Sequence, residues 1–145
     1  MNYKMIGKSL GSLLCVEAAC MVPSLVVALI YAEGDAQSFA ICIALLAAVG
    51  FGLGRIKPAT TSIYARDGFI IVALGWLLAS AFGALPFLLS DTVPTYVDAF
   101  FEAASGFSTT GSSILRDVEA APKGILFWRS FTHWIGGMGV LVFVL

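Results

Sequence analysis

The residues at 104–115 are small, hydroxylated and glycine-containing, and they lie between two apolar regions. They offer closely spaced backbone carbonyls and hydroxyls, the oxygen ligands that replace the hydration shell of a cation in ion pathways. Gly111 permits backbone angles barred to other residues, so that successive carbonyls can point the same way. The stretch therefore predicts a backbone-lined ion path whose ion-facing residues are Thr109, Thr110, Gly111 and Ser112, supported by Ser108 and Ser113.

The composition of the chain indicates that this path lies in a membrane. Of its 145 residues, 59% are hydrophobic and only 12% are charged, whereas a soluble domain has about 25% charged residues. The net charge of −1 gives no indication of a nucleic-acid partner. The cysteines lie in apolar runs without the spacing of a metal site or a disulfide framework, so we expect Cys15, Cys20 and Cys42 to be packing residues.

Apolar runs at residues 9–32, 39–53 and 69–89 predict three membrane-crossing helices. Pro23 is expected to kink the first helix. Glu17 is the only charged residue in that run, and we interpret it as a protonated or hydrogen-bonded carboxyl in preference to an ion ligand. Glycines at 50, 52 and 54 are expected to give the second helix a thin packing face. The expected fold class is an all-α integral membrane protein with one re-entrant pore helix and filter loop.

Charged residues determine the expected orientation. Lys4 and Lys8 precede the first helix, and three more basic residues lie between the second and third, whereas the loop between the first and second carries only acids. Positively charged loops face the cytoplasm, so the N-terminus is expected there. An acidic outer mouth would raise the local cation concentration. The acids expected outside are Glu33, Asp35, Asp91, Asp98, Glu102, Asp117 and Glu119.

A short helix after Pro94 is expected to enter the membrane and return. Thr95 is a suitable N-cap, and the residues at 98–105 are too few to cross the bilayer. Gly106 is expected to end this pore helix, after which the chain returns outward through the remainder of residues 104–115, called the filter stretch below. Glu102 lies within the helix, and we expect it to point into a polar pocket behind the filter with Arg129 as its partner.

A final apolar run at residues 125–145 follows the filter stretch. Its Trp128 and Trp134 suit a membrane interface. Glycines at 136, 137 and 139 provide a flat face for close helix contact. The run reaches the last residue without a polar stop, so we expect the chain to be a fragment.

Several motifs resemble the membrane subunit of Trk-type potassium uptake systems, the TrkH/KtrB-like cation transporters. The motifs are Arg66-Asp67-Gly68-Phe69, Gly83-Ala84-Leu85-Pro86-Phe87, and the runs at 98–102, 105–111, 124–130 and 134–139. The resemblance covers essentially the whole chain and implies that it is the N-terminal portion of such a protein. Residues 1–67 would form two N-terminal transmembrane helices with a cytoplasmic loop. Residues 68–145 would form the first of four helix–pore loop–helix repeats, incomplete at its C-terminus.

The same resemblance implies potassium uptake across the bacterial cytoplasmic membrane, with potassium as the substrate, no cofactor and no enzymatic activity. The segment Thr109-Thr110-Gly111-Ser112 would be the first of four filter segments, a relaxed relative of the potassium-channel motif TVGYG. Ser112 and Ser113 stand in place of its Tyr and Gly, which implies weaker discrimination against sodium. The family further implies a homodimer in membrane lipid and a cytoplasmic nucleotide-binding regulatory subunit. One quarter of a filter cannot form a pore, so the chain alone is expected to be inactive.

Two alternative functions remain open at this point. A homotetrameric pore-loop cation channel would obtain four filter loops from four copies, although it would not need the two extra N-terminal helices. An intramembrane serine hydrolase would use Ser108 or Ser112 as nucleophile and His133 as base. No carboxylate is obviously placed to orient His133, and a GxSxG nucleophile elbow is absent from the sequence. We therefore interpret His133 as a polar packing residue near the outer end of the last helix.

Overall fold

The part of the chain that the structure describes is built from helices, without a strand. The computed structural model describes residues 2–60 and 62–144, with side chains up to residue 139. The expected all-α fold is confirmed. Its helices are α1 (Tyr3–Tyr31), α2 (Ala36–Gly54), α3 (Ala65–Gly83), α4 (Leu85–Leu89), α5 (Tyr96–Phe107) and α6 (Lys123–Val144).

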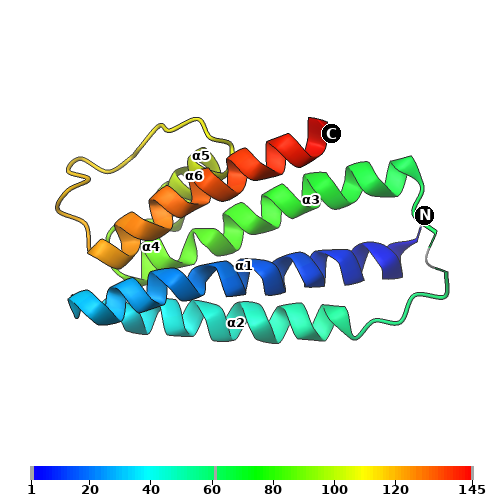
Figure 1. Ribbon diagram of the computed structural model, residues 1–145, viewed down its shortest axis with the longest axis horizontal. Coiled ribbons are helices and arrows are strands. Elements are labelled where there is room, and N and C mark those ends of the chain that lie inside the picture. Colours follow the sequence, from blue (N-terminus) through cyan, green and yellow to red (C-terminus); the bar gives the residue numbers. More distant parts are fainter. Residues whose placement is uncertain (1, 61, 145) are drawn as a thin grey trace.

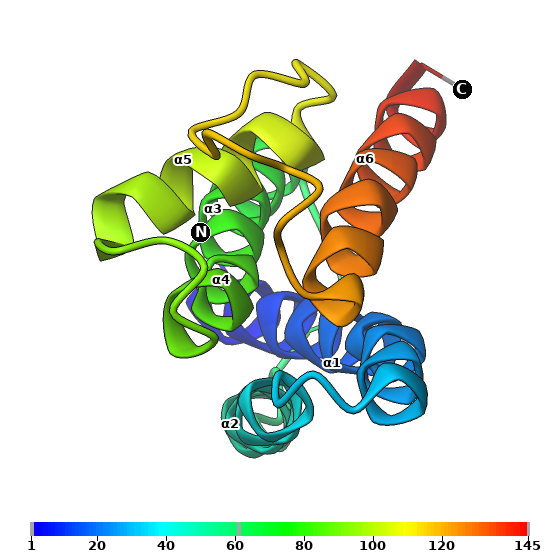
Figure 2. The same cartoon turned by 90° about the vertical axis from the view of Figure 1, so that its left-hand side faces the viewer.

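Within the described residues, three segments are long and apolar enough to cross a membrane. They are α1, α2 and the segment Ala65–Leu89, which contains α3 and α4. Helices α1, α2 and α3 run side by side along the long axis (Figure 1). Viewed along these helices, α2 lies at one edge, while α3, α5 and α6 lie on the other side of α1 (Figure 2). Helix α1 therefore lies between α2 and most of the unit that carries the filter stretch, while α2 also contacts α4 directly.

Helices α1 and α2 pack closely through facing glycines. A Cβ atom added to Gly11 would lie 2.8 Å from the carbonyl oxygen of Gly50, and one added to Gly50 would lie 2.9 Å from that of Gly11. Small residues of this kind let two backbones approach each other within a membrane. Gly52 and Gly54 have open space at the Cβ position, so Gly50 alone of the three glycines near the end of α2 provides the expected packing face.

The variant Gly50→Val is expected to separate α1 from α2. Overpacking a close contact costs about 1–3 kcal/mol, so the thermal midpoint of the purified complete protein in detergent should fall. Gly52→Val is the matched control, because it places the same side chain on the same helix in open space. Equal midpoints for the two variants would contradict the assigned contact.

The expected helix over residues 69–89 is divided into α3 and α4. Pro86 lies in the first turn of α4, and it has no N–H with which to continue the helical hydrogen bonds. In a membrane, freed carbonyls must find donors from neighbouring elements. One donor is the hydroxyl of Tyr96, which bonds to the carbonyl of Ala81 at 2.8 Å.

Trp128 of α6 supplies a second donor at this break. Its side chain is fully buried, and its Nε1 donates to the carbonyl oxygen of Gly83 at 3.0 Å. The expectation of an interfacial Trp128 is therefore wrong, because the indole lies inside the protein and bonds to its backbone. Trp134, by contrast, is 59% exposed and available to a membrane interface.

Trp128→Phe is expected to lower the free energy of unfolding by about 1–3 kcal/mol, because the buried Gly83 carbonyl loses its donor. Trp134→Phe makes the same chemical change at an exposed position and should have little effect. Thermal unfolding of the two complete proteins in detergent measures the difference. If both variants unfold at the wild-type temperature, the indole bond does not support the break.

The loop between α1 and α2 holds the start of α6. Glu33 Oε2 accepts a hydrogen bond from the N–H of Lys123 at 2.5 Å, and any side chain at Gly124 would collide with the carboxylate of Asp35. The first N–H groups of a helix lack partners within the helix, and the helix dipole favours carboxylates there. Asp35 is only 2% exposed, so it packs against α6 and is not part of an exposed acidic mouth.

Candidate cation path

Helix α5 leads directly into the filter stretch. It begins as expected, because Thr95 Oγ1 accepts a hydrogen bond from the N–H of Asp98 at 3.2 Å and caps the helix. The helix packs against both α3 and α6. Its 12 residues are too few to cross a bilayer. Its negative C-terminal end lies next to the filter stretch.

Gly106 does not end α5, contrary to expectation. The helix continues to Phe107, and Gly106 is buried against Thr132 of α6. Any side chain at this position would collide with Thr132. The glycine is therefore required for the close approach of two helices and does not act as a stop signal.

Thr109, two residues after the last helical residue of α5, adopts the conformation that stops the helix. Its φ of 58° lies in the left-handed region, and its N–H bonds to the carbonyl of Gly106 at 3.0 Å. The next N–H, of Thr110, bonds to the carbonyl of Ser105 at 3.0 Å. This pair of bonds is the Schellman motif, in which the left-handed residue is usually glycine. A β-branched residue in this conformation is uncommon, so the surrounding contacts must hold the turn.

The predicted ion-facing residues follow this turn. Residues 108–114 form no helix or strand and are exposed in the described chain. Gly111 has a φ of 79°, the left-handed conformation for which glycine was expected. The Ser105 hydroxyl donates to the carbonyl oxygen of Ser112 at 2.6 Å, which holds that carbonyl toward α5. The hydroxyls of Ser108 and Thr110 lie 2.8 Å apart.

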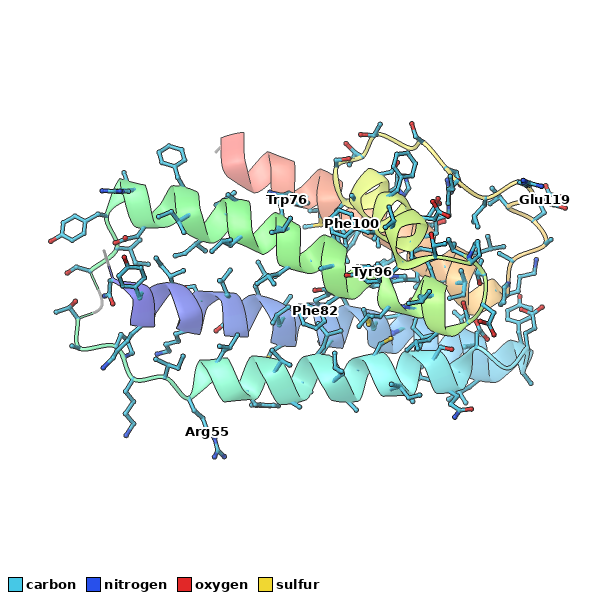
Figure 3. All side chains as sticks on the ribbon, turned by 180° about the vertical axis from the view of Figure 1, so that it is seen from behind. Arg55, Trp76, Phe82, Tyr96, Phe100 and Glu119 are labelled. Carbon is cyan, nitrogen blue, oxygen red and sulfur yellow. The ribbon has the colours of Figure 1, made fainter. Side chains whose placement is uncertain are left out.

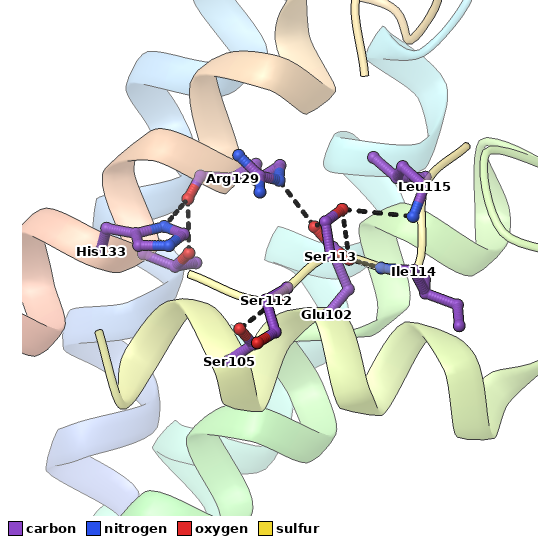
Figure 4. Close-up of polar contacts among 9 residues, drawn as sticks. Glu102, Ser105, Ser112, Ser113, Ile114, Leu115, Arg129 and His133 are labelled. Carbon is purple, nitrogen blue, oxygen red and sulfur yellow. Dashed lines mark hydrogen bonds and ion pairs between the residues drawn. The ribbon is translucent and has the colours of Figure 1, made fainter. Parts of the chain in front are cut away.

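Glu102 anchors the chain as it leaves the filter stretch. The residue is 2% exposed, and its carboxylate accepts a hydrogen bond from Arg129 Nε at 2.6 Å. It also accepts from the Ser113 hydroxyl, at 3.0 Å to each oxygen, and from the N–H of Ile114 at 2.9 Å. The expected pairing of Glu102 with Arg129 is confirmed. The carboxylate thereby joins α5, α6 and the returning chain (Figure 4).

A face of α6 without side chains receives the turn from α5. Gly136 lies against the backbone of Phe107, where any side chain would collide. A Cβ atom on Gly137 would lie 4.0 Å from Thr109 Cγ2, and one on Gly139 would lie 3.3 Å from Trp76. The expected flat packing face of α6 is confirmed, and it contacts the residue that ends the pore helix.

His133 lies on α6 behind the filter stretch. Its Nδ1 is 2.8 Å from the carbonyl oxygen of Arg129, and its Nε2 would lie 3.9 Å from a Cβ atom on Gly111. Sequence reasoning missed this position. The spacing of four residues from Arg129, which places both on one helix face, is the signal that could have indicated it. Among the described residues, neither Ser108 nor Ser112 bonds to His133.

Among the hollows that the described residues form, two lie beside the filter stretch. One has a volume of about 930 Å³ and lies between α3 and α5, where Trp76 and Phe100 face it (Figure 3). Its filter-side lining consists of Ser108, Thr110 and Ser112. The other has a volume of about 630 Å³. Its lining includes three of the acids expected outside, together with one base: Asp91, Asp98, Asp117 and Arg116.

Glu17 lies apart from the filter stretch, inside α1. It is 5% exposed, and within the described residues neither carboxyl oxygen has a hydrogen-bond partner. Its Oε1 would lie 3.2 Å from a Cβ atom on Gly83, beside the break between α3 and α4. The role of Glu17 stays a prediction.

Comparison with known proteins identifies the family. The family model TrkH, described as a cation transport protein, matches residues 35–145. The chain belongs to the TrkH family. The family description and the names of its relatives refer to cation transport, and they give the serine hydrolase alternative no support.

Named relatives extend the match to almost the whole TrkH-family chain. It is 36% identical to the Trk system potassium uptake protein TrkH of Halomonas elongata and 35% identical to that of Escherichia coli strain K12. Each alignment covers 98% of this chain but only 30% of the relative. The crystal structure of the potassium transporter TrkH from Vibrio parahaemolyticus is similar, with a TM-score of 0.92 at 35% identity over 98% of this chain and 31% of that one.

Proposed function

We propose that this TrkH-family chain is the N-terminal part of a potassium uptake protein, and that its residues 109–112 form the first segment of the ion filter. The main support for this proposal is the turn between α5 and α6, which Glu102 anchors. A short helix leads into an exposed segment with Gly111 in the left-handed region, and Glu102 ties the far end of that segment to α6. The names of the similar proteins, Trk system potassium uptake protein, support potassium as the ion.

The filter segment would act through its backbone. Carbonyl oxygens replace the water around a potassium ion, and the negative C-terminal end of α5 favours a cation beside it. Because the Ser112 carbonyl is already bonded to Ser105, Ser112 marks the limit of the segment that faces the ion freely. The acidic hollow would raise the cation concentration outside. The ion is the substrate, and no cofactor takes part.

One segment encloses only part of an ion, so the chain alone would be inactive. We assign residues 1–67 to the N-terminal helix pair with its cytoplasmic loop and residues 68–145 to the first of four helix–pore loop–helix repeats. The chain spans 30% of its relatives, which favours the remainder of the same protein as the source of the other segments. A homotetramer of the short chain is therefore the weaker candidate.

The proposed location is the bacterial cytoplasmic membrane, with the N-terminus in the cytoplasm. Arg55 and Glu119 lie toward opposite ends of the long axis (Figure 3), as a basic inner loop and an acidic outer loop require. We further propose that the complete protein forms a homodimer and binds a cytoplasmic nucleotide-binding regulatory subunit, as the family resemblance implies.

Potassium flux through the complete protein in liposomes tests the proposed function. We expect uptake of potassium that sodium reduces in part, because Ser112 and Ser113 relax the filter motif. A folded complete protein that transports neither ion would overturn the proposal. Potassium flux through the 145-residue chain alone, together with cross-linked tetramers, would favour the homotetrameric channel instead.

A further inference from the structure

His133 approaches the filter segment from the protein side. Its Nε2 would lie 3.9 Å from a Cβ atom on Gly111, and its Nδ1 would lie 3.6 Å from a Cβ atom on Gly106. The imidazole therefore fills the space between the end of α5 and the exposed segment. Figure 4 shows the ring beside Arg129, one turn earlier on α6.

The hydrogen bond at Nδ1 determines what Nε2 can do. Nδ1 lies 2.8 Å from the carbonyl oxygen of Arg129. A carbonyl oxygen only accepts, so Nδ1 must carry the proton in this contact. In the neutral ring, Nε2 is then an acceptor, and it faces the backbone near Gly111.

An acceptor at this place matches the needs of a filter backbone. Carbonyl oxygens that face an ion leave the N–H groups of the same segment pointing back into the protein, where they need acceptors. The Ser105 carbonyl already serves Thr110 at 3.0 Å and Gly111 at a longer 3.4 Å. No acceptor among the described residues is recorded for the N–H of Ser112.

We propose that His133 is a positioning residue for ion selectivity. Its Nε2 accepts a hydrogen bond, through one water molecule, from the N–H of Ser112, and so keeps the carbonyls of the segment directed toward the ion. This inference rests on the proposed function of the filter segment. It assigns a specificity role to a side chain that does not contact the ion.

Three variants of the complete protein distinguish the role of Nδ1 from the role of Nε2. His133→Asn retains an amide nitrogen near the Nδ1 position and removes the group that faces Gly111. His133→Gln places an amide oxygen or nitrogen near the Nε2 position. His133→Phe retains the ring volume without polar atoms and serves as a second test where the asparagine variant folds poorly. Uptake kinetics for potassium and sodium, in liposomes, give KM and maximal rate for each ion.

We expect His133→Asn and His133→Phe to raise the KM for potassium and to lower the preference for potassium over sodium by about three- to tenfold, the loss of one hydrogen bond. The maximal rate and the thermal midpoint should change little, and His133→Gln should restore the preference to within about twofold. An unchanged potassium preference in both His133→Asn and His133→Phe would overturn the inference, and so would a His133→Gln protein as impaired as His133→Asn. In either case, potassium uptake by the wild-type protein would still support the proposed function. A wild-type protein without potassium uptake overturns both.

Discussion

Gly111→Ala in the complete protein is expected to reduce potassium uptake by about five- to thirtyfold, because a left-handed conformation costs a residue with a Cβ atom roughly 1–2 kcal/mol. The φ of Gly111 is 79°. Space is not the obstacle, since the added methyl would lie at an ordinary 3.9 Å from His133. The methyl instead drives the backbone toward negative φ, which would turn the adjoining carbonyls away from the ion.

Gly111→Asp should abolish uptake or its selectivity for potassium, because it adds a carboxylate beside the ion path. Its backbone strain is smaller than that of alanine, since aspartate adopts the left-handed region more readily. Gly52→Ala is the control for both variants, since it adds a methyl in open space on a regular helix. Rubidium or potassium uptake by complete proteins in liposomes, at equal amounts of folded protein, measures the effect. Unchanged uptake and selectivity in either Gly111 variant would contradict the assignment of residues 109–112 to the filter.

The second large effect is expected at the ion pair behind the filter. Removing one partner of a buried pair costs about 3–5 kcal/mol, because the other charge is left unpaired. Arg129→Gln and a charge reversal at Glu102 should therefore both lower the thermal midpoint and uptake strongly. The side chain of Glu102 is 1% exposed and that of Arg129 19%, so the reversal at Glu102 is expected to be the more damaging.

Exchanging the two charges gives a sharper test. Glu102→Arg with Arg129→Glu should recover part of what each single reversal loses. Recovery should be incomplete, because Glu102 also accepts from Ser113 and from the N–H of Ile114. Ser113→Ala alone should then cause a smaller loss of about 1 kcal/mol. If the double variant transports no better than the single variants, the ion pair does not contribute to function. If uptake recovers fully, the bond from the Ile114 N–H to Glu102 does not anchor the chain.

Local chemistry made much of this fold predictable. The hydroxyl of Thr95 and the following apolar residues indicated a capped short helix, and the structure has that cap. Glu102 and Arg129 were expected to pair because a charged residue in an apolar helix needs a partner, and the pair is present. In each case the physical requirement belongs to the residue itself and does not depend on the geometry of distant elements.

The missed features all depend on how separate helices meet. Glycine is a common helix-ending residue, yet Gly106 is needed because Thr132, 26 positions later in the chain, packs against it. Tryptophan is typical of a membrane interface, but the Nε1–H of Trp128 bonds to the Gly83 carbonyl at the break between α3 and α4. The spacing of His133 from Arg129 indicates its face of α6, but its approach to Gly111 depends on how α5 and α6 pack together. Interhelical distances of this kind are not encoded in a local pattern.

The bond between Glu33 and Lys123 joins residues 90 positions apart, and this separation has a consequence for biosynthesis. Proteins emerge from the ribosome N-terminus first, so the acceptor for the first turn of α6 is made well before α6 itself. The helices α1 and α2 contain none of the proposed filter residues. The loop between them nevertheless provides Glu33 and Asp35, which contact the first residues of α6. Correct placement of α6 beside the proposed filter segment would therefore depend on a loop that is synthesised before either of them.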